Sequence, residues 1–227
     1  MKVYLTSIMR NGEPYLGRYL SQVGALQRAL LGRGDVLRTM VAEGDSTDQT
    51  WAHLVDATQQ YQGLEVVQLS HGGPAFGSVD DPTRWANIAR TWNRLFERVT
   101  RYSFDALIYV EADLLWEVPT MLKLLKDLER VPAVAPMSMH VGGFFYDTWG
   151  HRAQGSHFGP NPPYHPGLAA CEAGELFQLD SAGSCLVMRG EVARGCRFSE
   201  QDAMLGHDIY AKGYSLWLDS RFAVFHP

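Results

Sequence analysis

Two acidic side chains, Glu111 and Asp113, stand two positions apart in the segment Tyr109–Trp116, which reads YVEADLLW. The residues before them, Ala106–Val110, are strand-forming, and side chains two positions apart in an extended chain point to the same side. Two like charges at the mouth of a sheet repel each other. The pair therefore predicts a compensating neighbour, which is a bound cation, an arginine side chain or simply bulk water.

The acidic pair follows one of several strands that alternate with helices along the chain. Such alternation predicts an α/β sheet that is mostly parallel and covered by helices on both faces. In such sheets ligands bind outside the carboxyl ends of the strands, which is where the pair lies. The predicted strands are Val3–Ile8, Leu37–Val41, Leu64–Leu69, Ala106–Val110, Val131–Pro136, Ser184–Met188 and Phe222–Phe225, and the predicted helices run from Pro14 to before Gly32 and over Trp51–Tyr61, Arg84–Arg101, Pro119–Arg130 and Ser199–Lys212.

Two segments show no regular hydrophobic period. The residues from Ser70 to Pro82 are rich in Gly, Pro and Asp and are predicted to form a loop. Residues 139–178 hold many aromatic side chains, and this content disfavours disorder in so long a loop, so we interpret them as a folded wall on the substrate side. After this wall, Ser199 and Asp202 match the S-x-x-D capping pattern and predict a helix that begins at Ser199.

Size and composition indicate one ordinary globular domain. The chain has 227 residues, of which 46% are hydrophobic and 20% charged, and its net charge of −5 argues against a protein that mainly grips nucleic acid. The three cysteines are an odd number without metal-site spacing, so we expect a reducing cytoplasm rather than a disulfide framework. The start, MKVYLTSIMRN, lacks the apolar core of a signal peptide, and no apolar run is long enough to predict a membrane span.

Four arginines gather on one side of the predicted helix Arg84–Arg101, opposite its apolar face. Two interpretations stay open for this arginine stripe: a solvated helix face, or contact with an anionic partner. The stripe consists of Arg90, Arg94, Arg98 and Arg101.

Four separated segments resemble, in the same order, nucleotide-sugar glycosyltransferases of the GT-A fold. AEGDSTDQT resembles their D-G-S-x-D-x-T turn after the second strand, and ARTWNRLFERVTRYSFDALIYVEADLLWEVP resembles their helix, strand and D-x-D motif, with Glu111 replacing the first aspartate. FYDTWGHR is similar to a stretch of fungal mannosyltransferases of the capsule-associated and mannan-polymerase groups, and GHDIYAKGYSLWLDSRFAVFHP resembles their ending. The resemblance implies one GT-A catalytic domain over residues 1–227, with a nucleotide-sugar-binding half at 1–118 and an acceptor-side half at 119–227.

The resemblance also implies a divalent ion, Mn²⁺ or Mg²⁺, that neutralises the diphosphate of a GDP- or UDP-hexose donor. Asp113 is then the direct metal ligand, Glu111 binds through water or contacts the ribose, and His226 of the last strand is a further ligand. For Asp45, helix capping is as good an explanation as donor contact. The implied donor contacts are Thr6, Arg10, Glu43, Asp45, Asn93, Glu111 and Ala112.

The same resemblance implies where an acceptor and a catalytic base lie. Asp208 takes the place of the general base, with Asp113 as the second catalytic residue. The pair His207–Asp208 departs from the E-D pair of the relatives, and a retaining enzyme would use this region differently. The acceptor, a glycan or another hydroxyl compound, is implied to contact an aromatic platform with fixed polar groups, formed by Tyr146, Asp147, Trp149 and Arg152.

Three other functions fit parts of the sequence. A transferase that acts on a modified nucleic-acid base, as in phage DNA glucosylation, is favoured by the arginine stripe and opposed by the acidic total charge. A catalytically inactive sugar- or nucleotide-binding module is opposed by the joint presence of Asp113, Asp208 and His226. A NAD-binding Rossmann domain is disfavoured because no G-x-G-x-x-G follows the first predicted strand.

Overall fold

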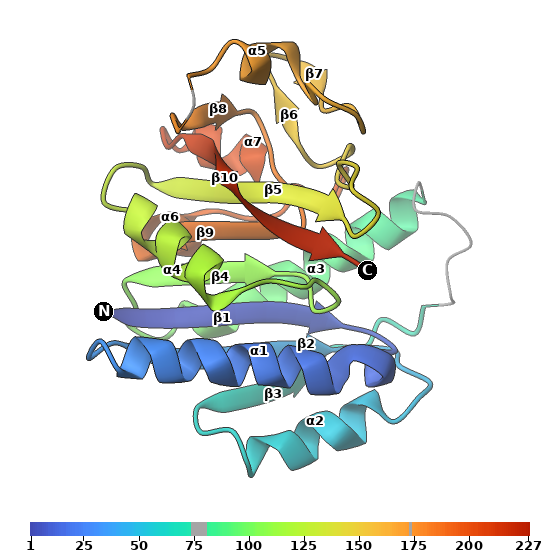
Figure 1. The fold of residues 1–227 in the computed structure, drawn as a ribbon. Coiled ribbons are helices and arrows are strands. Elements are labelled where there is room, and N and C mark those ends of the chain that lie inside the picture. The colour runs from blue at the N-terminus through green and yellow to red at the C-terminus, as the bar shows by residue number, and fades with distance from the viewer. Residues whose placement is uncertain (74–80, 173) are drawn as a thin grey trace.

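A central sheet of eight strands, in the order β3-β2-β1-β4-β9-β5-β10-β8, organises the chain (Figure 1). This computed structural model describes residues 1–73, 81–172 and 174–227. The central part of the predicted loop Ser70–Pro82 therefore lies outside the described residues. The strands of the sheet are β1 (Lys2–Met9), β2 (Val36–Glu43), β3 (Leu64–Gln68), β4 (Ala106–Val110), β5 (Ala133–His140), β8 (Phe177–Leu179), β9 (Cys185–Arg189) and β10 (Leu216–His226).

Most strand pairs in this sheet are parallel, as predicted. Strands β3, β2, β1 and β4 run parallel to one another, and β10 runs parallel to β5. Strand β9 is antiparallel to both of its neighbours, and β8 is antiparallel to β10. The carboxyl ends of β1, β2, β3 and β4 therefore meet along one edge, where the predicted ligand site lies.

Helices cover both faces of the sheet and enclose two apolar cores. Leu5 of β1 packs in one core with α1 (Glu13–Leu31), α2 (Thr50–Thr58) and α4 (Val118–Asp127). Its neighbour Tyr4 packs in the other. Alternate residues of a strand face opposite sides, so adjacent positions of β1 feed different cores. The helices of the second core are α3 (Pro82–Val99), α6 (Gly190–Gly195) and α7 (Gly206–Ala211).

Helix α3 places its first turn at the edge of the sheet where the predicted site lies. The carboxylate of Asp81 caps it by accepting the backbone N–H groups of Thr83 and Arg84, and Pro82 occupies the first turn. Further along, the fully buried Trp92 packs edge-on against Tyr109 of β4, with ring centroids 4.4 Å apart. The cap and the aromatic contact together fix the first turn of α3 at the edge where the parallel strands end.

The prediction of one long helix over Ser199–Lys212 is wrong. Residues from Ser199 to Leu205 form turns, and Ala203 adopts a left-handed conformation with φ 57°. The carboxylate of Asp202 accepts the N–H of Met204 instead of starting a helix. A non-glycine residue with positive φ interrupts the helical path, so α7 begins only at Gly206; helix α6 was also missed.

The aromatic segment after β5 is folded, as predicted. It contains the short strands β6 (Arg152–Ala153) and β7 (Ser156–His157) and the single-turn helix α5 (Pro166–Ala169). Phe145 and Phe158 are 1% and 2% exposed and pack against each other with centroids 5.2 Å apart. Within the described part of the chain, no helix combines the length and apolarity needed to cross a membrane.

Candidate active site

Two cavities open side by side where the parallel strands end. The larger one, about 350 Å³, is lined by residues that follow β4 and β5, by the turn before β9 and by the first turns of α3. The smaller one, about 230 Å³, is lined by the ends of β1, β2 and β3 and by α3. Arg84 and Ile88 of α3 line both cavities. The two spaces thus form one cleft with a cationic side chain at their junction.

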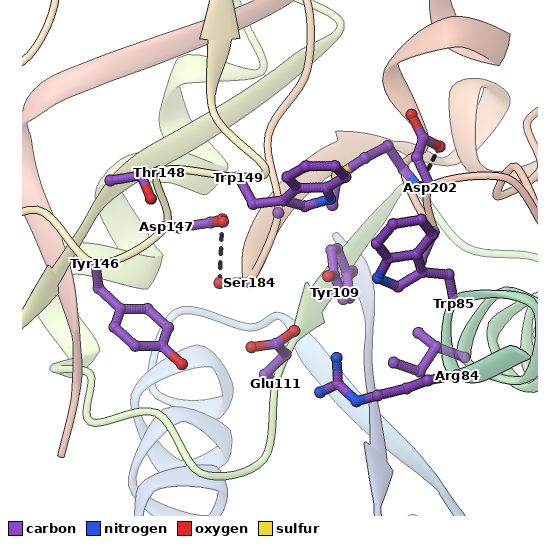
Figure 2. A pocket seen from close by; sticks show the side chains of 14 residues that line it. Arg84, Trp85, Tyr109, Glu111, Tyr146, Asp147, Thr148, Trp149, Ser184 and Asp202 are labelled. Atoms are coloured by element: carbon purple, nitrogen blue, oxygen red, sulfur yellow. Dashed lines mark hydrogen bonds between the residues drawn. The ribbon is translucent and has the colours of Figure 1, made fainter. Parts of the chain in front are cut away.

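Glu111 lies in the larger cavity, directly after β4 (Figure 2). Burial, and to a lesser extent the nearby carboxylates of Asp113 and Asp147, raise the pKa of Glu111 to about 8 although the guanidinium of Arg84 opposes them. Sequence reasoning placed Glu111 and Asp113 on one side of an extended chain. The chain instead turns at residues 112–113, so the two carboxylates lie in different surroundings.

Asp147 is the second carboxylate of the larger cavity, and its oxygens are tightly held. Its Oδ1 accepts the N–H of Gly150 at 2.8 Å, and its Oδ2 accepts the hydroxyl of Ser184 at 3.2 Å and lies 3.2 Å from Nδ1 of His151. Burial alone would raise the pKa of Asp147, but the interactions with His151, Gly150 and Ser184 outweigh it and lower the pKa below the usual value. Asp147 is therefore ionised at neutral pH.

Two glycines make room for the Asp147 carboxylate. A Cβ atom at Gly150 would stand 2.7 Å from both carboxylate oxygens, and one at Gly183 would stand 2.5 Å from Oδ2. Non-bonded contacts this short are sterically forbidden. Any larger residue at either position would displace the carboxylate from the cavity.

Stacked tryptophans form a wall of the larger cavity. The rings of Trp85 and Trp149 lie 5.2 Å apart and nearly parallel, and Trp149 is 42% exposed (Figure 2). The guanidinium carbon of Arg152 lies 5.1 Å from the centre of the Trp149 ring, and Nη1 of Arg152 lies 3.6 Å from Oδ2 of Asp202. Asp202 stands at the cavity rim with its carboxylate pointing away from Glu111 (Figure 2). Predicted acceptor residues Tyr146, Asp147 and Trp149 thus lie together, with Arg152 behind them.

The structure brings Asp113 and His226 together, although they are far apart in sequence. Their atoms Oδ2 and Nε2 are 3.3 Å apart, and both side chains remain partly exposed. The ring of His226 stacks on Tyr146 at 3.9 Å, and its backbone carbonyl accepts the N–H of Val141 at 2.9 Å. Pairing of β10 with β5 thereby fixes the terminal imidazole beside the carboxylate.

This pair suits a divalent cation. The Nδ1 atom of His226 lies 3.1 Å from the carbonyl oxygen of Pro227, and if Nδ1 carries the proton, Nε2 presents a lone pair to Asp113. Two acceptors 3.3 Å apart need a proton or a metal ion between them. In the described ranges no group of three or more His, Cys, Asp or Glu side chains could hold a metal ion, so other oxygen ligands would complete the coordination.

The smaller cavity is lined by Arg10 and Asp45, two of the predicted donor contacts. Asp45 adopts φ 58°, and its oxygens accept the backbone N–H groups of His71, Gly72 and Gly73. Burial raises the pKa of Asp45, but these hydrogen bonds prevail and lower it below its usual value. Asp45 therefore ties the end of β2 to the residues after β3, which is a different role from the predicted helix cap.

Comparisons with known proteins identify the fold. No family model and no curated protein matches the sequence. Solved glycosyltransferase structures do match the fold of this chain over almost its whole length. TarS of S. aureus (residues 1–349) aligns with 99% of this chain and 60% of its own, with a TM-score of 0.61 and 15% sequence identity. The chain has the GT-A fold. The sequence-based prediction of this fold is confirmed.

Two further GT-A structures are similar to this chain. The mannosyltransferase PcManGT from Pyrobaculum calidifontis, in complex with GDP-Man and Mn²⁺, has a TM-score of 0.60 and 13% identity, and the match covers 98% of this chain and 56% of PcManGT. GalNAc-T7, with UDP, GalNAc and Mn²⁺, has a TM-score of 0.60 and 12% identity over 100% of this chain and 44% of its own. The chain thus spans between about two fifths and three fifths of the length of these three GT-A structures.

Several predicted donor residues have partners inside the GT-A fold instead. The hydroxyl of Thr6 is fully buried and donates to the carbonyl of Ile108, and Glu43, 1% exposed, accepts the N–H of Ser46 and the amide of Gln68. The side-chain amide of Asn93 donates to the carbonyl of Phe198 and accepts its N–H. Ala112, the last residue of this group, is buried. Position at a strand end could not reveal these interior partners.

Asp208, the predicted base, is engaged on α7. Its Oδ2 accepts the N–H of Arg197 at 2.6 Å and lies 2.9 Å from Nζ of Lys212. Neither cavity has Asp208 among its lining residues. Lys212 is one helical turn beyond Asp208, so this pairing is local to the helix.

Several residues that line the larger cavity are not predicted from the sequence as site residues, among them Arg84, Trp85 and Ser184. Arg84 and Trp85 stand at the start of the predicted helix Arg84–Arg101, and Ser184 is the first residue of the predicted strand Ser184–Met188. A detectable signal was the Pro82 start of α3, which places the next residues at a helix N-terminus near the strand ends. The predicted helix begins at Arg84 and so leaves out Asp81, whose carboxylate caps α3.

The arginine stripe on α3 is less cationic than its sequence suggests. Arg90 forms an ion pair with Glu200, with 2.7 Å between Nη2 and Oε2. Glu97 lines the same surface hollow as Arg94, Arg98 and Arg101. These two acids offset part of the stripe's charge and favour the solvated-face interpretation over contact with a polyanion.

Proposed function

We propose that this chain is a metal-dependent glycosyltransferase that moves a hexosyl group from a nucleotide diphosphate sugar to a hydroxyl acceptor. The acceptor that we favour is a glycan. The observation that carries the proposal is the cleft itself. It joins two cavities at Arg84, and the Asp113–His226 pair stands next to Tyr146 at its edge. A donor with a nucleoside, a charged diphosphate and a sugar has the three parts that such a cleft would accommodate.

The nucleoside fits the smaller cavity. Ile8, Leu69 and Ile88 supply apolar wall there, and Arg10 adds a cationic side chain whose Nη2 donates to the carbonyl of Gly73. The diphosphate would lie at the junction, where the guanidinium of Arg84 can bind phosphate oxygens. Both GDP- and UDP-hexoses remain candidate donors, because TarS has been solved with UDP-GlcNAc and PcManGT with GDP-Man.

Asp113 and His226 would hold Mn²⁺ or Mg²⁺, and Glu111 would contribute through water. Such an ion supplies Lewis-acid stabilisation of the charge that develops on the departing diphosphate. The ring of Tyr146 keeps the His226 imidazole in place, with an interplanar angle of 11°. A carboxylate with one imidazole suits Mn²⁺ in particular.

The acceptor would bind over the stacked Trp85–Trp149 wall. Aromatic faces pack against the apolar faces of sugar rings, and nearby polar groups bind the hydroxyls. Trp149 is exposed at 42% and borders the cavity that holds Asp147. The base is not Asp208 in this proposal, because its carboxylate is held by Nζ of Lys212 and by the backbone N–H of Arg197.

The narrower resemblance to fungal-type mannosyltransferases stays a prediction, as do the two half-domains. We also propose a cytoplasmic location, because Cys171, Cys185 and Cys196 are free thiols, which suits a reducing compartment.

Donor binding tests the proposal. A panel of UDP- and GDP-hexoses with Mn²⁺ should include at least one member that raises the melting temperature, because a ligand of the folded state stabilises it by mass action. Arg84→Gln should weaken the binding of that donor by about tenfold or more, since the substitution removes a charge-assisted hydrogen bond to the diphosphate. Arg98→Gln lies on the same helix outside both cavities and is the matched control. No shift with any nucleotide sugar would contradict the proposed function.

A further inference from the structure

The larger cavity holds the ionised carboxylate of Asp147, whose neighbours fix it in one orientation. Asp147 is held by a backbone N–H, a hydroxyl and an imidazole, and it is wedged between Gly150 and Gly183. Its side chain is 10% exposed. No role assigned so far to this residue, as one of several acceptor contacts, requires such close positioning.

The geometry points to Asp147 as the base that deprotonates the acceptor hydroxyl, and to His151 as the residue that positions it. This inference rests on the proposed function, because it needs a glycosyl donor in the cleft. It adds a chemical role for Asp147 and a role for the buried His151, which touches neither cavity directly.

The hydrogen bonds of Asp147 leave capacity for one more donor. A carboxylate offers about four lone-pair sites. Oδ2 is occupied by Ser184 and His151, whereas Oδ1 has Gly150 alone. The remaining site on Oδ1 can accept an acceptor O–H.

His151 is placed to keep that geometry fixed. It is 1% exposed, its Nδ1 faces Asp147, and its Nε2 lies 3.3 Å from the carbonyl oxygen of Pro136 in β5. The ring also packs edge-on against Phe145, with centroids 5.1 Å apart. The imidazole therefore links the carboxylate to the central sheet, which limits its rotation.

The resulting step is a single displacement. The acceptor oxygen forms a bond to the anomeric carbon of the donor while Asp147 takes the hydroxyl proton. The bond between the anomeric carbon and the diphosphate oxygen breaks, and its electron pair leaves with the nucleoside diphosphate. One displacement inverts the anomeric configuration.

Two other acids of this region fit the role less well. Asp208 is paired with Lys212 and with the backbone of Arg197. Asp202 lies at the rim, bound to the N–H of Met204, and its carboxylate points away from Glu111 (Figure 2). Of these three, only Asp147 accepts a hydrogen bond from Ser184, another residue that lines the larger cavity (Figure 2).

Steady-state kinetics of variants at Asp147 and His151 test the inference. The donor is whichever UDP- or GDP-hexose the wild type turns over, and the acceptors are simple alkyl hexosides. Asp147→Asn should lower kcat by roughly 10²- to 10⁴-fold, the usual contribution of general base catalysis. The donor-induced rise in melting temperature, measured against the variant's own baseline, should remain. His151→Phe keeps the ring and removes the donor to Asp147, so kcat should fall by roughly 10- to 100-fold through misplacement, and His151→Gln should recover part of it.

The controls separate this inference from the proposed function. Asp180→Asn makes the same chemical change at an exposed carboxylate outside both cavities and should keep wild-type kcat. A kcat for Asp147→Asn within threefold of wild type, or a product with retained anomeric configuration, would overturn the role of Asp147 while leaving the transferase intact. If the wild type neither binds nor turns over any nucleotide sugar, the proposed function fails and this inference falls with it.

Discussion

The chemistry of this chain depends on where a few carboxylates find their partners. Glu111 and Asp147 share a cavity, yet burial raises the pKa of Glu111 to about 8, while hydrogen bonds lower that of Asp147. The spacing of Glu111 and Asp113 predicts a ligand site at this edge of the sheet, and two cavities open there. It could not show that Asp113 turns toward His226, because that contact depends on the pairing of β10 with β5.

At this scale we predict that Asp147 contributes to stability in a pH-dependent way. Its pKa is lower in the folded state than in the unfolded chain, so its contribution is complete above about pH 4 and is lost as pH falls through the folded pKa. Asp147→Asn should reduce the free energy of unfolding at pH 7 by about 2 kcal/mol, because hydrogen bonds to a charged group are lost. Urea unfolding at pH 7 and at successively lower pH checks this. A difference between wild type and variant that grows on acidification would contradict it.

Among the helices and strands, the bounds of those whose residues are all buried were the most predictable. The five residues of β4 are all buried, and the structure gives the predicted bounds, Ala106–Val110. The region 199–212 was not predictable in the same way, because its capping pattern is satisfied by local turns around Ala203 rather than by a helix. The first turn of α3 was predicted as helix, but its contribution to the cleft depends on tertiary packing of Trp92, which no local pattern encodes.

Helix α4 and strand β10 meet at a buried pair of acids, which gives an element-scale prediction. Asp219 is fully buried and binds Arg221 through both carboxylate oxygens, whereas Oδ2 of Asp127 is buried without a hydrogen-bond partner among the described residues. Burial and the neighbouring Asp219 raise the pKa of Asp127. Asp127→Asn should therefore change the free energy of unfolding by less than about 1 kcal/mol, because a neutral amide replaces a carboxyl whose raised pKa already favours its neutral form.

The contrasting variant is Asp219→Asn. It leaves the guanidinium of Arg221 without its carboxylate beside the irregularity in β10 between Asp219 and Ala223, and should cost about 2–3 kcal/mol. Urea denaturation of both variants at pH 7 gives the comparison. A larger loss for Asp127→Asn than for Asp219→Asn would show that the two acids have been assigned the wrong way round.

The whole molecule carries a net charge of −5, and this bears on the choice of acceptor. Glu97 and Glu200 neutralise part of the charge of the arginine stripe. Together with the negative net charge of the molecule, this disfavours a nucleic-acid acceptor. We predict that fluorescence anisotropy with single-stranded or duplex DNA shows weak binding at about 50 mM salt and no steep loss towards about 200 mM, because few phosphates are neutralised. Arg94→Gln should leave that weak signal unchanged. Tight binding that falls steeply with salt, and falls further in Arg94→Gln, would restore the nucleic-acid interpretation.

The fold as a whole was predictable from the alternation of strands and helices, whereas the division of the cleft into two cavities joined at Arg84 was not. That division arises from side chains at the ends of β1, β2, β3, β4 and β5, before β9 and on α3, and their relative placement is a property of the assembled sheet. The central claim is that this cleft releases a nucleoside diphosphate from a sugar donor with the help of the Asp113–His226 pair.

Release of nucleoside diphosphate from the stabilising UDP- or GDP-hexose, measured with Mn²⁺ and then with excess chelator, tests that claim most directly. We predict release by the wild type with Mn²⁺, loss of release on chelation, and a loss of at least about 100-fold in Asp113→Asn, because the ion's charge stabilisation is worth several kcal/mol. Asp105→Asn, at an exposed carboxylate before β4, should release product at the wild-type rate. Undiminished release in Asp113→Asn or in the presence of chelator would contradict the account.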